Sequence, residues 1–163
     1  MKHVLIVVDI QKDFVDGALG TAEAVAMIPN AVKKIREFDG EIFVTYDTHF
    51  EDYMNTAEGG KLPVPHCIKG TKGWEIADGL YVEGTKIIDK PNFGWPHWDE
   101  ETLECVELIG LCTDICVVSN ALIIKATFPD AQVKVDSACC AGVTPESHEA
   151  ALKTMQMCQV EVV

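Results

Sequence analysis

Basic residues are scarce in this sequence, which has 13 Lys and Arg against 26 Asp and Glu and a formal net charge of −13. Proteins that bind nucleic acid or an anionic membrane surface carry clusters of Lys and Arg, because these side chains neutralise phosphate charge. We therefore expect no nucleic-acid partner and no membrane partner. Small molecules are the expected ligands.

Long hydrophobic runs are also missing. No stretch reaches the roughly 20 apolar residues that span a bilayer, and the apolar run near the start ends in charged residues without a signal-peptide cleavage pattern. The seven cysteines form an odd set that does not resemble the disulfide framework of a secreted protein. These absences predict a cytoplasmic protein in a reducing environment.

Six short apolar segments predict the strands of one sheet. They are near-continuous apolar runs, which is typical of strands that are covered on both faces. The segments lie at residues 3–8, 41–46, 86–90, 105–110, 131–136 and 159–163.

Helical patterns alternate with several of these segments. Residues 30–38 have apolar side chains at helical spacing after Pro29, which suits a first helical position. Residues 114–127 follow the same pattern, and residues 145–157 follow it after Thr144, a suitable N-cap. Alternation of strand and helix favours right-handed βαβ units. We expect a three-layer α/β/α fold with a six-stranded, mostly parallel sheet, in a single domain over residues 1–163.

Residues 47–85 break the alternation. This stretch is rich in Gly, Pro, Thr and charged residues, and it is too long for an ordinary connection between two elements. It predicts a functional loop or lid.

Reactive side chains follow four of the predicted strands. Asp9 follows the first, Asp47 the second, Lys90 ends the third, and Cys112 and Cys116 follow the fourth. In open α/β sheets, ligands bind beyond the carboxyl ends of the strands, which is where all of these residues would lie. Each has a simpler explanation on its own, as a turn residue, a solvated lysine or a packed thiol. Their coincidence at one edge favours a catalytic site.

The chemistry of the set is coherent. A thiol becomes a useful nucleophile when a cation, a helix N-terminus or a base favours its thiolate. Lys90 would supply the cation, and Asp9 would take the proton of Cys116 and return it to a leaving amine. Backbone N–H groups of Cys112 and Cys116 would stabilise the oxyanion of a tetrahedral intermediate. The set predicts hydrolysis of an amide.

Two motifs extend this interpretation. Residues 9–14 read DIQKDF, which fits a D-x-Q-x-D-F pattern, and residues 110–117 read GLCTDICV, which fits G-x-x-T-D-x-C-V. With these motifs and Lys90 the chain resembles the isochorismatase-like cysteine hydrolases, and it looks most like the nicotinamidases among them. The resemblance implies a parallel sheet in the order 3-2-1-4-5-6. It also implies a triad of Cys116 as nucleophile, Asp9 as general base and acid, and Lys90.

The resemblance assigns further roles. The family usually has a cis peptide in the nucleophile loop, here Leu111–Cys112, which aims the N–H of Cys112 into the oxyanion hole. It also implies that Phe14 forms an aromatic wall of the pocket and that Trp95 forms another. Core packing is the alternative for both aromatic residues. The sulfur of Cys112 would matter only under oxidation, when a disulfide with Cys116 would silence the enzyme.

The same resemblance places a metal site in the long segment. Asp47, His49 and His66 resemble the metal ligands of nicotinamidases, and Glu58 is a candidate fourth ligand because the family varies between His and Glu there. Carboxylate and imidazole donors with open positions suit one divalent ion, zinc first, with manganese or iron as alternatives. In that family the ion holds the pyridine nitrogen of the substrate.

The implied reaction is hydrolysis of nicotinamide to nicotinate and ammonia through a Cys116 thioester. Another small amide or carbamoyl compound is the alternative substrate. A thiol-based redox or metal-binding module is the alternative outside catalysis, but the spacing C-x-x-x-C differs from the C-x-x-C of such sites. No G-x-G-x-x-G follows the first strand, which argues against a dinucleotide site. From the family we also expect a homo-oligomer.

Overall fold

The computed structural model describes residues 2–100 and 102–163, and these residues form one six-stranded sheet in the order β3-β2-β1-β4-β5-β6. Every pair of neighbouring strands is parallel. The predicted strand order and the parallel sheet are therefore confirmed. The strands are β1 (His3–Val8), β2 (Glu41–Asp47), β3 (Lys86–Lys90), β4 (Cys105–Leu111), β5 (Gln132–Ala141) and β6 (Glu161–Val162).

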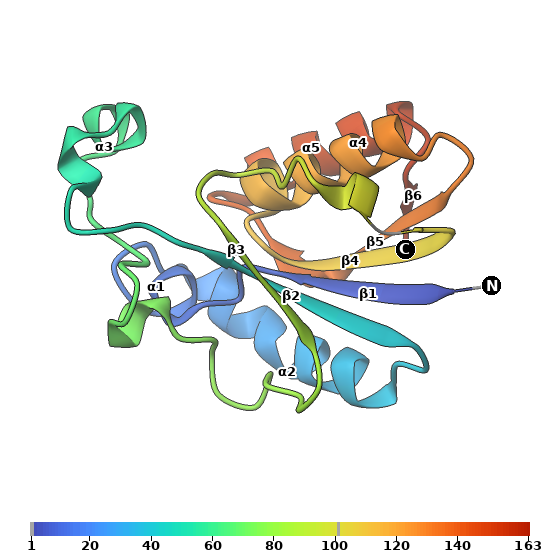
Figure 1. Ribbon diagram of the computed structural model, residues 1–163, viewed down its shortest axis with the longest axis horizontal. Coiled ribbons are helices and arrows are strands. Elements are labelled where there is room, and N and C mark those ends of the chain that lie inside the picture. Colours follow the sequence, from blue (N-terminus) through green and yellow to red (C-terminus); the bar gives the residue numbers. More distant parts are fainter. Residues whose placement is uncertain (1, 101) are drawn as a thin grey trace.

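Helices cover both faces of the sheet, as Figure 1 shows. Two helices, α1 and α2, lie on one face, and α4 and α5 lie on the other. Successive side chains of β1 point to opposite faces, so Leu5 packs with the α2 side and Ile6 with the α4 and α5 side. The helices are α1 (Lys12–Val15), α2 (Ala22–Glu37), α3 (Ala57–Lys61), α4 (Val118–Thr127) and α5 (Pro145–Met157).

The centre of the sheet positions the site. β1 is fully buried over Val4–Val8, and it lies between β2 and β4. The order of the strands reverses between β1 and β4, so the connections that leave these two strands part to opposite faces. A crevice at the carboxyl ends of β1 and β4 follows from this topology.

The start of α2 differs from the prediction. The helix begins at Ala22 and not at residue 30, and Pro29 lies inside it on the exposed side. The Thr21 side chain caps the helix by accepting a hydrogen bond of 3.0 Å from the Ala24 N–H. Residues Ala24, Met27, Ala31 and Ile35 form one buried stripe, and its packing on the sheet stabilises the helix across the proline.

The two helices on the other face follow the sequence more closely. α5 has the predicted bounds, and Thr144 and Ser147 form a reciprocal capping box at its start. The predicted helix over residues 114–127 is divided into a π-helical turn, Thr113–Val117, and α4. Such turns are often found at functional sites.

The segment between β2 and β3 has little regular structure. It contains α3 and the 3-10 turns Tyr53–Asn55 and Lys72–Trp74, and a third 3-10 turn, Trp98–Glu100, follows β3. One isolated bridge, between Gln11 and Ile76, ties the segment to the body of the protein, and a second, between His49 and Ile68, lies within the segment. In Figure 1, α3 lies at the upper left, away from the two helical layers.

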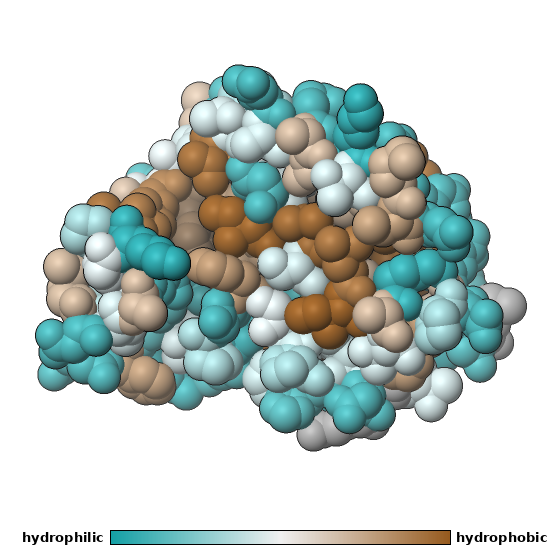
Figure 2. Space-filling model, turned by 90° about the horizontal axis from the view of Figure 1, so that it is seen from above, coloured by the Kyte–Doolittle hydropathy of each residue, from teal (hydrophilic) through white to brown (hydrophobic). Residues whose placement is uncertain are grey.

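The surface agrees with the composition. Figure 2 shows hydrophilic side chains over most of the face seen from above, with a band of apolar side chains across its middle. All seven cysteines are free thiols. Within residues 2–100 and 102–163, none of the helices combines the length and the apolar character that crossing a membrane requires.

Candidate active site

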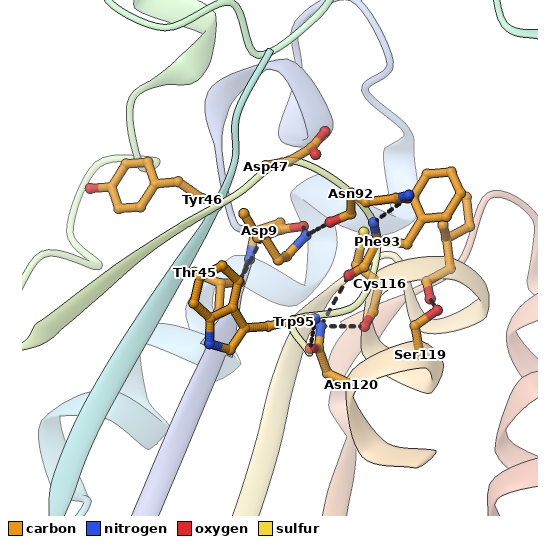
Figure 3. A network of polar contacts seen from close by, with 12 residues as sticks. Asp9, Thr45, Tyr46, Asp47, Asn92, Phe93, Trp95, Cys116, Ser119 and Asn120 are labelled. Carbon is orange, nitrogen blue, oxygen red and sulfur yellow. Dashed lines mark hydrogen bonds and ion pairs between the residues drawn. The ribbon is translucent and has the colours of Figure 1, made fainter. Parts of the chain in front are cut away.

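Three of the predicted catalytic side chains meet beyond the carboxyl ends of β1, β3 and β4. Lys90 Nζ donates a hydrogen bond of 2.5 Å to Oδ2 of Asp9, and both side chains are fully buried. Cys116 is 4% exposed, and its thiol lies close enough to Asp9 for the carboxylate to raise the pKa of the thiol. Figure 3 shows Asp9 and Cys116 close to each other at this edge of the sheet. The simpler explanation of Lys90 as a solvated lysine is excluded by its burial.

The main chain at Asp9 adopts an uncommon conformation. Its φ angle is 47°, in the left-handed region that residues other than glycine seldom occupy. Neighbouring β2 holds it there, because the Asp9 N–H donates to both oxygens of Thr45 over 3.2 Å. The Thr45 hydroxyl in turn donates to Oδ1 of Asp9 over 2.6 Å. Strain of this kind at a buried carboxylate is typical of a working site.

The charges of the triad depend on one another. Burial raises the pKa of Asp9, although the cation of Lys90 opposes this shift. Burial also raises the pKa of the Cys116 thiol well above its usual value, and the carboxylate of Asp9 adds to the shift. For Lys90 burial works to lower the pKa, but the charges of Asp9 and Cys116 raise it above its usual value. Lys90 is therefore charged, and Cys116 carries its proton.

The turn that carries Cys116 is fixed by close backbone packing. Gly110 has a φ of 129°, and a Cβ atom there would lie 2.0 Å from the carbonyl oxygen of Val8, so only glycine fits. The Leu111–Cys112 peptide bond, which follows in the same turn, is cis, as the family resemblance implied. The turn then enters the π-helical segment that contains Cys116.

Two polar residues of the second motif tie this turn to its surroundings. Thr113 is fully buried, and its hydroxyl lies 2.7 Å from Nδ1 of His148 on α5. The carboxylate of Asp114 accepts hydrogen bonds of 3.2 Å from the N–H of Val143. The turn is thus held from β1 on one side and from the start of α5 on the other.

The four predicted metal ligands lie together. Oδ2 of Asp47 is 3.0 Å from Nε2 of His49 and 3.3 Å from Nε2 of His66. Oε1 of Glu58 is 3.5 Å and 3.6 Å from the same two nitrogens. One ligand atom from each residue lies within 4.8 Å of the others, so the group could hold a metal ion.

The donor set fits a divalent cation. Oδ1 of Asp47 is buried and has no hydrogen-bond partner among the described residues, as expected of an oxygen that faces an ion. Burial works to raise the pKa of Asp47, but hydrogen bonds with His49 and His66 lower it to about 2. Nδ1 of His66 lies 2.8 Å from the carbonyl oxygen of Val64, which fixes Nδ1 as the donor and leaves Nε2 free for the ion.

Two residues of the DIQKDF stretch hold the backbone of this group of candidate metal ligands. Nε2 of Gln11 donates to the carbonyl oxygen of Asp47 over 2.9 Å, and Oε1 of Gln11 accepts from the Asp47 N–H over 2.8 Å. Oδ2 of Asp13 accepts a hydrogen bond of 2.8 Å from the N–H of Cys67, next to His66. The DIQKDF stretch therefore supplies Asp9 to the triad and two residues that place metal ligands.

A cavity of about 260 Å³ connects the two groups. Cys112 and Cys116 lie at its wall with the metal-ligand candidates Asp47, Glu58 and His66. Its apolar lining comes from Phe14, Leu19, Leu62, Phe93, Ile115 and Val143.

Of the two aromatic walls expected from the sequence, one lies in the cavity. Phe14 lines it, with its ring centroid 5.4 Å from that of His66. Trp95 is not part of the lining and packs against the core on the α4 side, because its N–H is tied to Asn120. Phe93, two residues earlier, lines the cavity instead.

Sequence reasoning missed several residues of the site. Thr45 bonds to Asp9, and Asn120 bonds to Phe93 and Trp95, all distant in the chain, so no local pattern gives a signal. Phe93 stood in the same PNFGW stretch as Trp95, and the choice between two aromatic residues depends on a loop conformation. Only the structure shows that Phe93 is the more open of the two, with 39% of its surface exposed.

Comparisons with known proteins agree with this geometry. The model of the isochorismatase domain family matches residues 3–163. An isochorismatase family protein of Bacillus subtilis, PncA, is 31% identical over 143 residues, which cover 75% of this chain and 78% of that protein. The nicotinamidase/pyrazinamidase of Mycobacterium tuberculosis is 25% identical over 187 residues, 99% of this chain and 98% of that one.

A solved structure extends the similarity to three dimensions. The pyrazinamidase of Pyrococcus horikoshii, determined in complex with zinc, superposes with a TM-score of 0.87 at 29% identity and covers 100% of this chain and 99% of its own. The sheet order, the position of the reactive residues and these similarities all agree. The chain therefore belongs to the isochorismatase family, as an amidohydrolase.

Proposed function

We propose that the protein hydrolyses nicotinamide to nicotinate and ammonia, with Cys116 as nucleophile. One observation carries the proposal: Cys116 and the candidate metal ligands Asp47, Glu58 and His66 lie on the wall of one cavity of about 260 Å³. A small planar ring fits a cavity of this size, with its amide at the thiol and its ring nitrogen toward the metal ligands. The relatives named nicotinamidase support the same substrate.

The triad would form the thioester in two proton transfers. Asp9 takes the proton of the Cys116 thiol, the sulfur attacks the amide carbon, and a C–S bond forms. The N–H groups of Cys112 and Cys116 hold the oxygen of the tetrahedral intermediate. Asp9 then gives its proton to the nitrogen, the C–N bond breaks, and ammonia leaves. Lys90 keeps its proton and offsets the negative charge throughout.

Hydrolysis of the thioester would use the same residues in reverse roles. Asp9 takes a proton from a water molecule, and the hydroxide attacks the thioester carbon. The C–S bond breaks, nicotinic acid leaves and loses its proton to the solvent, and the sulfur recovers its proton from Asp9. Each cycle returns the triad to its starting state.

Asp47, His49, Glu58 and His66 are the residues that would hold a metal ion. We propose zinc, because two imidazoles and two carboxylates suit it and because the related pyrazinamidase was solved with zinc. Manganese and iron suit the same donors. When bound, the ion would supply a Lewis acid that holds the ring nitrogen of the substrate.

Ammonia release from nicotinamide by the purified protein tests the proposal. Wild-type protein should turn over, and Cys116→Ala should lose activity by about 10³-fold or more, as expected when a nucleophile is removed. Cys158→Ala is the matched control, because Cys158 is exposed and far from the cavity lining, and it should keep full activity.

The intermediate gives an independent readout. Mass spectrometry after rapid quenching should find an acyl adduct on the peptide that contains Cys116. An adduct on Cys112 instead, or full activity of Cys116→Ala, would overturn the assignment of the nucleophile. A folded, zinc-loaded protein that ignores nicotinamide yet forms an adduct with another small amide or carbamoyl compound would keep the mechanism and change the substrate.

Three wider expectations belong with this proposal. We propose that residues 1–163 form a single domain, that the protein acts in the cytosol, and that it assembles as a homo-oligomer. The free thiols support the second expectation, since a reducing compartment keeps thiols in that state. The apolar band in Figure 2 supports the third.

A further inference from the structure

Asn120 is a fully buried polar residue on α4 that belongs to neither the triad nor the metal cluster. A side-chain amide can donate two hydrogen bonds and accept two. All four are made here. A buried amide with complete pairing to separate segments fixes the relative positions of those segments.

The four hydrogen bonds join the nucleophile turn to the loop after β3. Nδ2 of Asn120 donates to the carbonyl oxygen of Cys116 over 2.8 Å and to that of Phe93 over 3.1 Å. Oδ1 accepts from the N–H of Trp95 over 2.9 Å and from Nε1 of Trp98 over 3.1 Å. Figure 3 shows Asn120 beside Cys116, with its contacts to Cys116, Phe93 and Trp95.

The loop that Asn120 holds forms one wall of the substrate cavity, because Phe93 lines that cavity. Its first residues are tied to the triad, since Lys90 Nζ donates to the carbonyl oxygen of Asn92 over 3.1 Å. Gly94 lies so close to α4 that a Cβ atom there would be 2.4 Å from Cδ1 of Ile123. Among the described residues of this loop, the hydrogen bonds that reach α4 are those of Asn120.

We propose that Asn120 is the positioning residue that sets the spacing between the Cys116 nucleophile and the Phe93 wall, and so the fit of the cavity to a flat aromatic amide. This inference rests on the proposed function. One bond of Asn120 holds the nucleophile turn, and three hold the loop. Loss of the first should lower kcat, and loss of the other three should raise KM.

Two substitutions separate these effects. In Asn120→Ala all four bonds are lost, so kcat should fall and KM should rise, each by about 10-fold, as for a small misplacement of reacting groups. In Asn120→Thr the hydroxyl can still bond the carbonyl of Cys116 one helical turn back. KM for nicotinamide should rise by about 10-fold, with kcat within about 3-fold of wild type, because a threonine hydroxyl keeps one of the four bonds.

Ser119→Ala is the matched control. Ser119 precedes Asn120 on the same helix, and its hydroxyl bonds the carbonyl oxygen of Ile115 within that helix. Both kinetic constants should stay within about twofold of wild type, because only a local hydrogen bond is lost. For every variant, kcat is calculated per active enzyme molecule, and the concentration of active enzyme is measured by titration of Cys116. Unchanged kcat and KM in folded Asn120→Thr and Asn120→Ala, with only a lower Tm, would overturn the proposal.

A chemical readout keeps this test separate from the choice of substrate. The rate at which iodoacetamide alkylates Cys116 needs no substrate, and it reports how firmly the buried thiol is held. Asn120→Ala should be alkylated at least about 5-fold faster than wild type, since opening of the site exposes the thiol. Equal rates would overturn the positioning role. Faster alkylation in a protein that ignores nicotinamide would uphold it while the proposed substrate fails.

Discussion

At the scale of single residues, both oxygens of the Asp9 carboxylate are engaged. Oδ1 accepts the Thr45 hydroxyl and Oδ2 accepts Lys90. Burial raises the pKa of Asp9, and the bonds from Lys90 and Thr45 oppose that rise. In the proposed mechanism this balance matters, because Asp9 must be ionised to take the proton of Cys116. Thr45 would then tune the general base without touching the substrate.

Thr45→Val removes the hydroxyl and keeps the shape of the side chain. Without this hydrogen bond the pKa of Asp9 should rise further, so the acidic limb of kcat/KM should move to higher pH, by up to about one unit. A pH profile of nicotinamide hydrolysis measures the shift. Thr45→Ser keeps a hydroxyl and should restore the wild-type limb. An unchanged limb in Thr45→Val would remove Thr45 from this role.

The residues that the sequence identified are those with a positional signal. Asp9, Lys90 and Cys116 lie at strand ends and within motifs, and the structure brings them together as predicted. Thr45 and Asn120 lack such a signal, because their partners lie 36 and up to 27 residues away in the chain. A threonine in a strand and an asparagine in a helix look ordinary until the fold supplies their partners.

At the scale of elements, β1 lies close against β4 where the turn that carries Cys116 begins. The carbonyl of Val8 occupies the space that a side chain at residue 110 would need. The register of β4 against β5 shifts between Leu108 and Gly110, so the strand changes course just before the turn. The glycine thus allows a central strand to end in a catalytic turn.

Gly110→Ala should be severely destabilising. The added Cβ would lie 2.0 Å from the Val8 oxygen, at a φ of 129°, and we expect a loss of about 3 kcal/mol or more in the free energy of unfolding. Thermal and urea unfolding measure it. Gly60→Ala is the control, because its added Cβ meets no atom within 4 Å apart from its chain neighbours and the backbone of its own helix, and alanine favours the helix α3. Equal midpoints for Gly110→Ala and wild type would contradict the steric argument.

Element boundaries show where sequence reasoning fails. Strands β1 and β3 and helix α5 have the predicted bounds, since apolar runs and the Thr144 cap mark them clearly. The start of α2 was misplaced because Pro29 resembled a first helical residue. Tertiary packing of the Ala24–Ile35 stripe overrides that local signal.

At the scale of the whole molecule, the long segment after β2 brings three of the candidate metal ligands to the edge of the sheet where Asp9, Lys90 and Cys116 lie. His49, Glu58 and His66 come from this segment, and Asp47 ends β2. The segment has few strand contacts with the sheet, so a bound ion would add a cross-link between it and the body. Stability of the folded protein should depend on the ion.

Metal content and thermal unfolding test this dependence. Zinc at about 100 times its Kd should stabilise the folded state by about 2.7 kcal/mol, which raises Tm by roughly 5–10 °C for a chain of this size. The double variant His49→Ala, His66→Ala should bind no zinc and show no shift in Tm. His3→Ala removes an exposed histidine outside the cluster and should behave as wild type. Equal zinc content in the double variant and wild type would refute the site.

The separation of the metal cluster from the triad along the chain has an evolutionary consequence. Residues 48–66 carry three of the four side chains that would anchor a substrate ring, and none of the triad. Replacement of that stretch as a cassette would change which compound is retained and leave the bond-breaking apparatus intact. One scaffold can in this way give rise to hydrolases for many compounds, and a protein engineer could follow the same route.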